Sequence, residues 1–504
     1  MTQSNMNFNQ IFFSIVMMLF ISTFINGQHR GDNLSFQGLN DFNNYGVKAA
    51  AMGGTHLAGS NDVNSIFGNP AGLIGLKSIQ FTVSANSYQS KIWENQDYRS
   101  NRQFVTLPFY LSGLYVPNPA NNGKWDYDAF FNDPTYIVAD PTLGLDPYSS
   151  EAANWQYDKN EFIFNNVAMA IPFSLFDKEF IAAASYSRNS ILDYDRNNTY
   201  LDPHIGFSGY GGLAGRVTAA DDTINFNWFD YSRIRSGNLN QITLGVAAEL
   251  FPFLKVGVSA NIINGESDDF HGLNKIGYFS LIGGANSFKF SYDTLNTTET
   301  GTSKYSSFSL SFGTVITLNR INIGIQVKTP YTFEREYNLT QVIAKKSGNQ
   351  TVQLTGTDKA KYPLGIAIGI NFKPIDQFTL AFDLESTPYS KTEFELTSPD
   401  STLGSYANQT IVRLGMEYKV LDFLSILAGF RNEPKLFIPD GSAEKESGPN
   451  SKFYTVGASL DFFFGRFDFA FEYNVMNYYD SYFSNTNYVT EKFTNVMLGY
   501  TYTF

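Results

Sequence analysis

The last ten residues of the chain, Asn495 to Phe504, read NVMLGYTYTF. Apolar or aromatic side chains occupy every second position, namely Val496, Leu498, Tyr500, Tyr502 and Phe504. Small or polar residues lie between them, and Met497 is the one exception. Because successive side chains of a strand point to opposite faces, this spacing predicts a strand with one apolar and one mostly polar face. Such strands are typical of barrels that separate lipid from a polar interior.

The same alternation recurs upstream and defines fourteen predicted strands. Their approximate cores are 79–88, 162–174, 179–192, 239–251, 254–266, 304–318, 321–335, 361–373, 377–389, 408–420, 423–433, 452–464, 467–482 and 493–504. The polar faces carry charged residues such as Lys328, Asp383 and Arg413. An Arg or Lys on the lipid face costs about 2–4 kcal/mol at the bilayer centre, so we expect these faces to line a lumen. A soluble β-sandwich is disfavoured, because its dry core would bury the same charges.

The connections between these strands alternate in length. Short turns fall at 176–178, 251–253, 319–320, 374–376, 421–422 and 465–466. Long connections fall at 89–161, 193–238, 267–303, 336–360, 390–407, 434–451 and 483–492. Short periplasmic turns with long outer loops are the asymmetry of outer-membrane barrels. The sequence therefore predicts an all-β fold, a 14-stranded antiparallel transmembrane β-barrel over residues 77–504.

Composition agrees with this fold and excludes some functions. Aromatic residues make up 16% of the chain, and they favour strands and the interface girdles of barrels. The net charge of −12 argues against nucleic-acid binding, which requires a basic face. Cysteine is absent, so the chain has neither disulfides nor a thiol nucleophile. The mean hydropathy of −0.20 is expected of strands that are apolar on one face only.

The N-terminus carries a candidate targeting signal. The run Ile11 to Ile25 is apolar apart from Ser14, Ser22 and Thr23. Its length suits the hydrophobic region of a signal peptide and is short for a membrane-spanning helix, which needs about 20 residues. We predict a signal peptide over residues 1–27 that is cleaved after Gly27.

A glycine-rich segment lies between this signal and the first strand. Residues 46–76 read GVKAAAMGGTHLAGSNDVNSIFGNPAGLIGL. Each glycine in a helix interior costs about 1 kcal/mol, and Pro70 would break a helix further. We therefore expect residues 28–76 to form a compact, irregular plug with short helical turns.

Gly53, Gly54, Asn69, Pro70 and Ala71 of this segment resemble the N-terminal hatch of the FadL/TodX family. These are outer-membrane barrels that take up long-chain fatty acids and hydrocarbons. The resemblance implies a hatch over 28–76 that plugs the lumen, passive transport of a hydrophobic small molecule, and lateral exit at a kink in the third strand. It also implies a bacterial outer-membrane location among outer-membrane lipids. The C-terminal strand resembles the strand that the barrel-assembly machinery recognises.

Two further groups of residues are candidates for transport. The apolar residues Ile276, Tyr278, Phe279 and Leu281 lie in the predicted loop after the fifth strand, where the family has a capture groove. An apolar outer loop either packs on itself or binds a ligand. The predicted third strand has small residues at its middle, Ala182, Ala183 and Ala184, which could leave a gap in the wall.

Other functions remain as alternatives. FadL-like barrels with a similar hatch also serve protein secretion as shuttles or anchors for secreted proteins. An enzyme is disfavoured, because no predicted strand contains a His that could act with a Ser on the barrel wall. The four histidines form no pair at the spacing of metal ligands on a helix. We expect no catalytic residues, no metal site and no cofactor.

Overall fold

The computed structural model describes most of the chain downstream of the predicted signal peptide. The described residues are 35–39, 45–59, 62–98, 117–118, 124–125, 145–175, 178–205, 223–282, 287–291, 295–345, 347–397, 406–439, 448–482 and 485–504. The predicted signal peptide (1–27) and the first residues of the predicted hatch (28–34) lie outside them.

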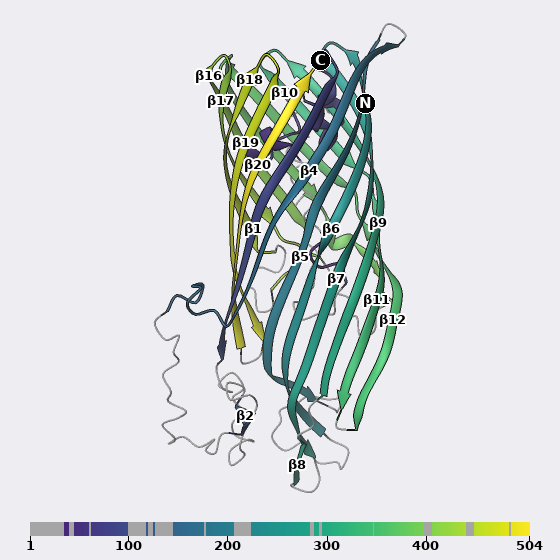
Figure 1. Ribbon diagram of the computed structural model, residues 1–504, viewed down its shortest axis with the longest axis vertical. Coiled ribbons are helices and arrows are strands. Elements are labelled where there is room, and N and C mark those ends of the chain that lie inside the picture. Colours follow the sequence, from purple (N-terminus) through teal and green to yellow (C-terminus); the bar gives the residue numbers. More distant parts are fainter. Residues whose placement is uncertain are drawn as a thin grey trace, which may run out of the picture.

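The described strands form a closed antiparallel barrel of fourteen strands, as the sequence predicts (Figure 1). Three of the fourteen are each interrupted once, so they carry two labels: β10 with β11, β12 with β13, and β14 with β15. The barrel strands are β1 (Gln80–Tyr98), β4 (Trp155–Leu175), β5 (Lys178–Ile205), β6 (Thr223–Phe251), β7 (Leu254–Ile282), β9 (Leu295–Leu318), β10 (Ile321–Lys328), β11 (Tyr331–Lys345), β12 (Gly348–Tyr362), β13 (Gly365–Ile375), β14 (Phe378–Thr387), β15 (Glu393–Glu395), β16 (Gln409–Leu421), β17 (Leu424–Pro434), β18 (Asn450–Phe462), β19 (Gly465–Tyr482) and β20 (Asn485–Thr503).

The first and last strands close the ring. β1 pairs with β20 along its whole length, from Gln80 opposite Thr503 to Tyr98 opposite Asn485. Two further strand pairs lie outside the ring of fourteen: β8 (Ser287–Ser291) pairs with the end of β7, and β2 (Pro117–Asn118) pairs with β3 (Lys124–Trp125). No described helix is long and apolar enough to cross a membrane.

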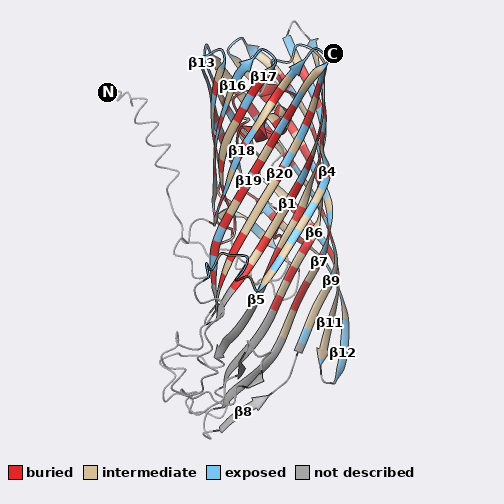
Figure 2. Cartoon of the chain, turned by 60° about the vertical axis from the view of Figure 1, so that its left-hand side comes forward, coloured by how far each residue is buried: buried red, intermediate tan, exposed pale blue. Residues whose placement is uncertain are grey.

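The two faces of the barrel differ as period-two patterning requires (Figure 2). On β13 the side chains of Ile366, Ile368 and Ile370 are 43–47% exposed on the outside, whereas Ala367 between them is buried. The predicted charged face lines the interior, because Asp383, Arg413 and Glu472 are all buried. Apolar surface of this extent on the outside of a monomer is the surface that a bilayer covers.

The two ends of the barrel differ in strand length. Tight turns join the strands at the end where the C-terminus lies, and at the opposite end several strands run on (Figure 1). The prediction of a loop over 336–360 is wrong. There β11 and β12 form a hairpin, in which Tyr331 lies opposite Tyr362 and Lys345 opposite Gly348. Much of 193–238 and 267–303 is strand as well. The apolar alternation fades in these parts because polar residues occupy both faces, which hid the strands in the sequence.

These extensions continue the barrel sheet beyond the ring of fourteen strands. They consist of β5 from Arg188 onward and the neighbouring outer parts of β6, β7, β9, β11 and β12, paired in that order. We call this part of the sheet the projecting sheet. Its two edges are β5 and β12, and it stands on one side of the barrel mouth (Figure 1).

Candidate functional site

Two described stretches of the chain, Tyr45–Gly59 and Asp62–Leu76, lie inside the barrel, and together we call them the hatch segment. It contains three short helices: α2 (Val47–Ala51), η1 (Val63–Ile66) and η2 (Pro70–Leu73). Residues of α2 pack against Leu427 of β17 and Ala470 of β19. Residues of η1 and η2 pack against β4, β5 and β6 in a second buried cluster. The hatch segment therefore contacts strands on different sides of the lumen.

Gly53 and Gly54 allow the chain to approach the wall closely. Both adopt positive φ values, 69° and 81°, which favour glycine. A Cβ on Gly53 would lie 2.6 Å from the carbonyl oxygen of Leu414 and 2.7 Å from the backbone nitrogen of Phe430. The Gly53 N–H also donates to the hydroxyl of Thr455, at 2.9 Å. Any side chain at Gly53 would push the segment away from β16 and β17.

Asn69, Pro70 and Ala71 form the start of η2. Asn69 is fully buried, and its Oδ1 accepts a hydrogen bond from the Ala71 N–H at 3.1 Å. Its Nδ2 donates to the carbonyl of Leu57 at 2.7 Å and to that of Thr314 on β9 at 2.9 Å. Pro70 occupies the first helical position, where a missing N–H costs nothing. One amide thus joins two turns of the hatch segment to the barrel wall.

Polar side chains hold the hatch segment at three more points. Lys48 pairs with Glu417 at 2.7 Å, and Asp62 pairs with Arg466. The backbone N–H of His56 donates to Asp383 at 2.7 Å. Burial, together with the charge of Arg413, lowers the pKa of His56 to about 4. The imidazole is therefore neutral at neutral pH. Its Nδ1 lies 2.6 Å from the Gly54 carbonyl oxygen, which can only accept a hydrogen bond, so Nδ1 carries the proton and donates it.

A cavity of about 300 Å³ lies next to the hatch segment, inside the barrel. Tyr45, Gly46 and Ala50 of that segment line it on one side. Its walls combine aromatic or apolar side chains with uncharged polar ones, among them Asn86, Tyr88, Ile163, Tyr194, Phe453, Phe493 and Asn495. Charged residues also line it, and some of them form ion pairs: Arg431 lies 2.9 Å from Glu433 and 3.3 Å from Glu472. A cavity that combines an apolar part with polar and charged side chains suits an amphipathic or uncharged guest.

The barrel wall is interrupted beside this cavity. The ladder between β4 and β5 covers only Asn166–Leu175 and Lys178–Ser187. At the same level the β1–β4 register shifts, so that Asn165 of β4 bulges. Beyond Ser187, β5 turns inward: the Arg196 N–H donates to Glu94 of β1 at 3.1 Å, and Asn487 of β20 donates to the Arg196 carbonyl at 3.2 Å.

Side chains rather than backbone bonds cross this interruption. Lys159 of β4 donates to the Ser190 hydroxyl at 2.7 Å and to the Ile191 carbonyl at 3.0 Å. Glu161 accepts from Ser190 at 2.8 Å and from Tyr88 at 2.7 Å. Ile163 and Asn165 line the cavity at the same place. Side-chain bridges can open without unzipping a strand ladder, so the wall can open here more readily than where β4 and β5 are paired.

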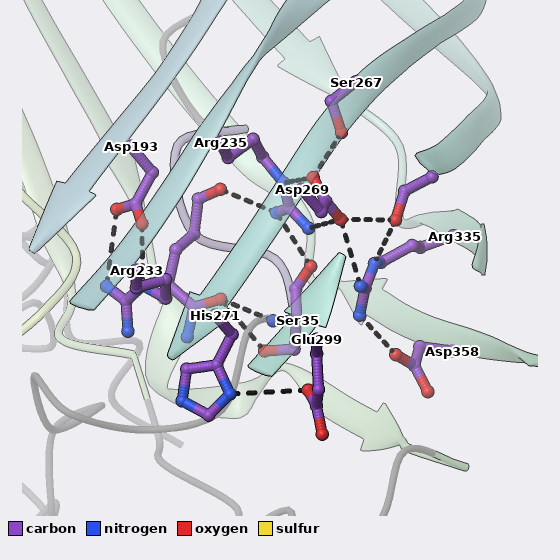
Figure 3. Close-up of polar contacts among 12 residues, drawn as sticks. Ser35, Asp193, Arg233, Arg235, Ser267, Asp269, His271, Glu299, Arg335 and Asp358 are labelled. Carbon is purple, nitrogen blue, oxygen red and sulfur yellow. Dashed lines mark hydrogen bonds and ion pairs between the residues drawn. The ribbon is translucent and has the colours of Figure 1, made fainter. Parts of the chain in front are cut away.

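A network of buried charges lies on the inner face of the projecting sheet (Figure 3). Arg235 faces Asp269 through two contacts of 2.9 Å. Asp269 also lies 3.2 Å from Arg335, which lies 3.0 Å from Asp358. All four side chains are at most 1% exposed. A buried charge needs such a partner, because leaving one alone costs several kcal/mol.

This network holds a second N-terminal segment, Ser35 to Leu39. Arg235 donates to the carbonyls of Ser35 and Gln37, both at 2.9 Å. Phe36 is fully buried in an aromatic cluster, with its ring 6.3 Å from that of Phe333 and 6.0 Å from that of Phe394. Gly38 lies against β5, since a Cβ there would be 2.8 Å from the Leu192 carbonyl. The segment therefore joins the projecting sheet to the inward turn of β5.

The structure places the predicted exit residues three positions or more before the interruption. Ala182, Ala183 and Ala184 are paired on both sides, to Ile171–Met169 of β4 and Val246–Leu244 of β6. Ala183 faces inward onto the hatch segment in the cluster with Val63 and Ile66. The ladder is thus closed at the alanines, because small residues shape the lumen there without breaking a backbone bond.

The predicted capture residues lie in a strand rather than in a loop. Ile276, Tyr278, Phe279 and Leu281 belong to the outer part of β7, and their side chains are outside the described residues. Sequence reasoning missed the charged network. Arg235, Asp269 and Asp358 fall in segments predicted as loops, and Arg335 is the last residue of the predicted strand 321–335. The spacing Arg233-x-Arg235 was the available signal, since period two puts both side chains on one face of a strand.

Comparisons with known proteins place this fold. No protein-family model and no curated protein matches the sequence. A solved structure of a Pseudomonas aeruginosa FadL homologue matches 92% of this chain and 98% of its own, with 14% identity and a TM-score of 0.56. The toluene transporter TodX of P. putida matches 92% and 99%, with 12% identity and a TM-score of 0.54. The monoaromatic hydrocarbon channel CymD matches 92% and 98%, with 11% identity and a TM-score of 0.51. The chain therefore has the fold of the FadL and TodX channels, as the hatch sequence predicts.

Proposed function

We propose that this protein is an outer-membrane channel through which hydrophobic small molecules diffuse passively. One observation carries the proposal: a cavity of about 300 Å³ inside a barrel with an apolar outer face lies directly beside an interruption of the wall. A cavity of this size is at the lower end of the range for small-molecule sites. Two proteins of the same fold are named as carriers of toluene or monoaromatic hydrocarbons, which supports the ligand class.

The proposed path has three stages. An apolar molecule leaves water near the outer part of β7, where Ile276, Tyr278, Phe279 and Leu281 are the candidate capture residues. It then occupies the cavity, which the hatch segment bounds. Exit is sideways through the β4–β5 interruption, because the molecule gains about 0.8 kcal/mol per CH₂ by avoiding water. In this proposal the exit lies at the interruption, beside Asn165 and Arg188. Ala182–Ala184 lie in the paired part of the wall, three positions or more before it.

The hatch is proposed to block the straight route to the periplasm. Residues 28–76 form this element in the proposal, and its described part contacts strands on different sides of the lumen. Signal cleavage after Gly27, insertion by the barrel-assembly machinery through β20 and contact with outer-membrane lipids complete the scheme. Long-chain fatty acids and aromatic hydrocarbons are the substrate classes to test.

The experiment compares uptake of a labelled fatty acid and a labelled alkyl-aromatic in cells with and without the protein. We expect uptake of at least one class above the vector control, and a co-purified apolar molecule in native mass spectrometry. Replacing Asn69 and Pro70 together by Ala should lower this uptake while the barrel still migrates differently boiled and unboiled. If neither class enters, and a secreted protein is retained in cells that lack the gene, the secretion-shuttle function replaces this one.

A further inference from the structure

The cavity beside the hatch segment has a polar spot on the wall that β1 and β20 form. Asn86 of β1 and Asn495 of β20 both line the cavity. In the β1–β20 ladder Asn86 lies opposite Met497 and Asn495 lies opposite Tyr88, so the two amides are diagonal neighbours on the inner face. Asn86 is 9% exposed and Asn495 is 2% exposed. Two uncharged amides are therefore buried next to each other at the edge of the cavity.

Both amides have an unused hydrogen-bond acceptor. The Nδ2 of Asn495 donates to Glu472 at 3.2 Å. The Oδ1 atoms of Asn86 and Asn495 are buried, and neither accepts a hydrogen bond from any residue that the structure describes. A buried acceptor without a partner is costly, so a guest that donates a hydrogen bond to it is favoured. The terminal torsion of Asn has a broad minimum, so either amide can turn its oxygen toward a guest.

Aromatic rings adjoin these amides. Phe493 lies two residues before Asn495 and therefore on the same face of β20. Its ring centroid is 5.9 Å from that of Tyr88 and 6.3 Å from that of Phe453, and all three side chains line the cavity. Two residues along a strand are about 7 Å apart, which is close to the length of a phenol ring with its hydroxyl. A guest can thus place a ring against Phe493 and an oxygen atom at Asn495.

The charges around the cavity disfavour an acidic guest. Among the described residues that line it, four are basic and four are acidic, so the lining has no net charge to attract an anion. Glu472 is hydrogen-bonded to Asn495, and a carboxylate placed at this amide would meet a like charge. Arg431 is already paired with Glu433 and Glu472. The polar spot therefore suits an uncharged group.

We propose that the guest of this cavity is a phenol or another small aryl alcohol, whose hydroxyl donates to Asn86 or Asn495 and whose ring packs against Phe493. A hydroxyl both donates and accepts hydrogen bonds, whereas a hydrocarbon does neither and a carboxylate only accepts. The cavity volume of about 300 Å³ is at the lower end of the range for small-molecule sites, which suits a guest with a single ring. This inference rests on the transport function proposed above and narrows its substrate class.

Four probes that share one ring and one methyl group test the inference: p-cresol, toluene, p-methylanisole and p-toluate. Their binding to the full-length protein in lipid nanodiscs is measured by equilibrium dialysis of the radiolabelled compounds, and protein-free nanodiscs correct for partition into lipid. We expect p-cresol to bind about tenfold more tightly than toluene, because it gains one hydrogen bond to an otherwise unpaired acceptor. Like the Tyr side chain, p-cresol is uncharged at neutral pH. p-Methylanisole has lost the O–H group and should bind as toluene does, and p-toluate should bind more weakly than p-cresol.

The variant that tests the site is Asn86→Leu with Asn495→Leu, which removes both amides and nearly keeps the side-chain volume. It should bind p-cresol about tenfold more weakly than the wild type does, whereas the affinity for toluene should not fall. The matched control is Asn432→Leu, which replaces another Asn whose buried Oδ1 is unpaired in the described part of the chain but which does not line the cavity. It should leave all four affinities unchanged. The shift of the unboiled band on gels verifies that each variant is folded, and the comparison of p-cresol with p-methylanisole needs no variant at all.

Three outcomes overturn the inference and leave the transport function standing, because a guest still binds. They are equal affinity for p-cresol and p-methylanisole, tightest binding of p-toluate, and unchanged p-cresol binding in the folded double variant. Absence of binding by all four probes overturns the inference as well. The transport function fails together with it only if the uptake assay described above also gives no signal over the vector control.

Discussion

Asn69 offers the most direct test of how the hatch segment is held. Its side-chain amide makes three hydrogen bonds, to the Leu57 carbonyl, the Thr314 carbonyl and the Ala71 N–H, at 2.7, 2.9 and 3.1 Å. The residue is fully buried, so water cannot replace these partners without movement. Substitution by Ala removes all three bonds and leaves the β-ladders of the wall intact.

The expected size of the effect follows from these contacts. A buried hydrogen bond contributes about 1 kcal/mol net, so the seated hatch segment should lose about 3 kcal/mol relative to a detached state in which the turn around Asn69 is also locally unfolded. That corresponds to about a hundredfold increase in the detached population. The barrel should stay folded, because two of the lost bonds lie within the hatch segment and the third joins it to Thr314 without belonging to a β-ladder.

Two measurements check this estimate. Hydrogen exchange of the amides between Leu57 and Leu73 should accelerate about a hundredfold, since it reports local opening. Ion conductance in planar bilayers should show openings that the wild type lacks. The matched control is Asn371→Ala, which truncates another inward-facing Asn whose Oδ1 has no hydrogen-bond partner in the part of the chain that the structure describes. Unchanged exchange and conductance in Asn69→Ala, with the barrel folded, would refute the reasoning.

Three further predictions concern other contacts. Arg235→Met removes the donors to Ser35 and Gln37, so a cysteine placed at Gln37 should react with a thiol reagent at least about tenfold faster than in the Arg235 background. Lys159→Ala removes bridges across the β4–β5 interruption, and uptake at matched protein level should rise by up to about tenfold; lower uptake would contradict an exit there. The pKa of His56 in the seated hatch segment is about 4, below its ordinary value of 6.5. Between these two pH values the detached form binds more protons than the seated form. The seated hatch segment should therefore lose stability as the pH falls from 6.5 toward 4. Exchange protection factors of the hatch measure this loss, and His56→Gln should abolish it.

The strand count could be read from the sequence because lipid imposes a strict pattern. Residues such as Ile366, Ile368 and Ile370 must be apolar where they meet the bilayer, and Ala367 and Gly369 must be small or polar where they meet the lumen. Beyond the bilayer that constraint ends. Residues 348–357 are uncharged and mostly polar on both faces of the strand. Apolar and polar residues therefore do not alternate regularly there, and the sequence predicts a loop.

The candidate site was only partly accessible to sequence reasoning. The close approach of Gly53 and the turn at Asn69 follow from local chemistry, since a positive φ and a capping amide each favour a residue type. The interruption at Ser187 does not, because Ala182–Ala184 and the residues after Ser187 look equally strand-like. It arises from the Asn165 bulge on the neighbouring strand and from contacts of β5 with β1 and β20. The Arg235 network depends in the same way on strand neighbours that only the fold brings together.

The contacts of the hatch segment also constrain the order of assembly. The bond from Gly53 to Thr455 joins residues 402 positions apart, and the bond between Asp62 and Arg466 joins residues 404 positions apart. The segment emerges early during synthesis, yet the surfaces that receive it are completed only when β18 and β19 are in place. Contacts of such long range form slowly, because the chain loses loop-closure entropy before the contacts that compensate for it have formed. The hatch segment can therefore bury the apolar side of α2 only after nearly all of the remaining chain has been inserted into the barrel.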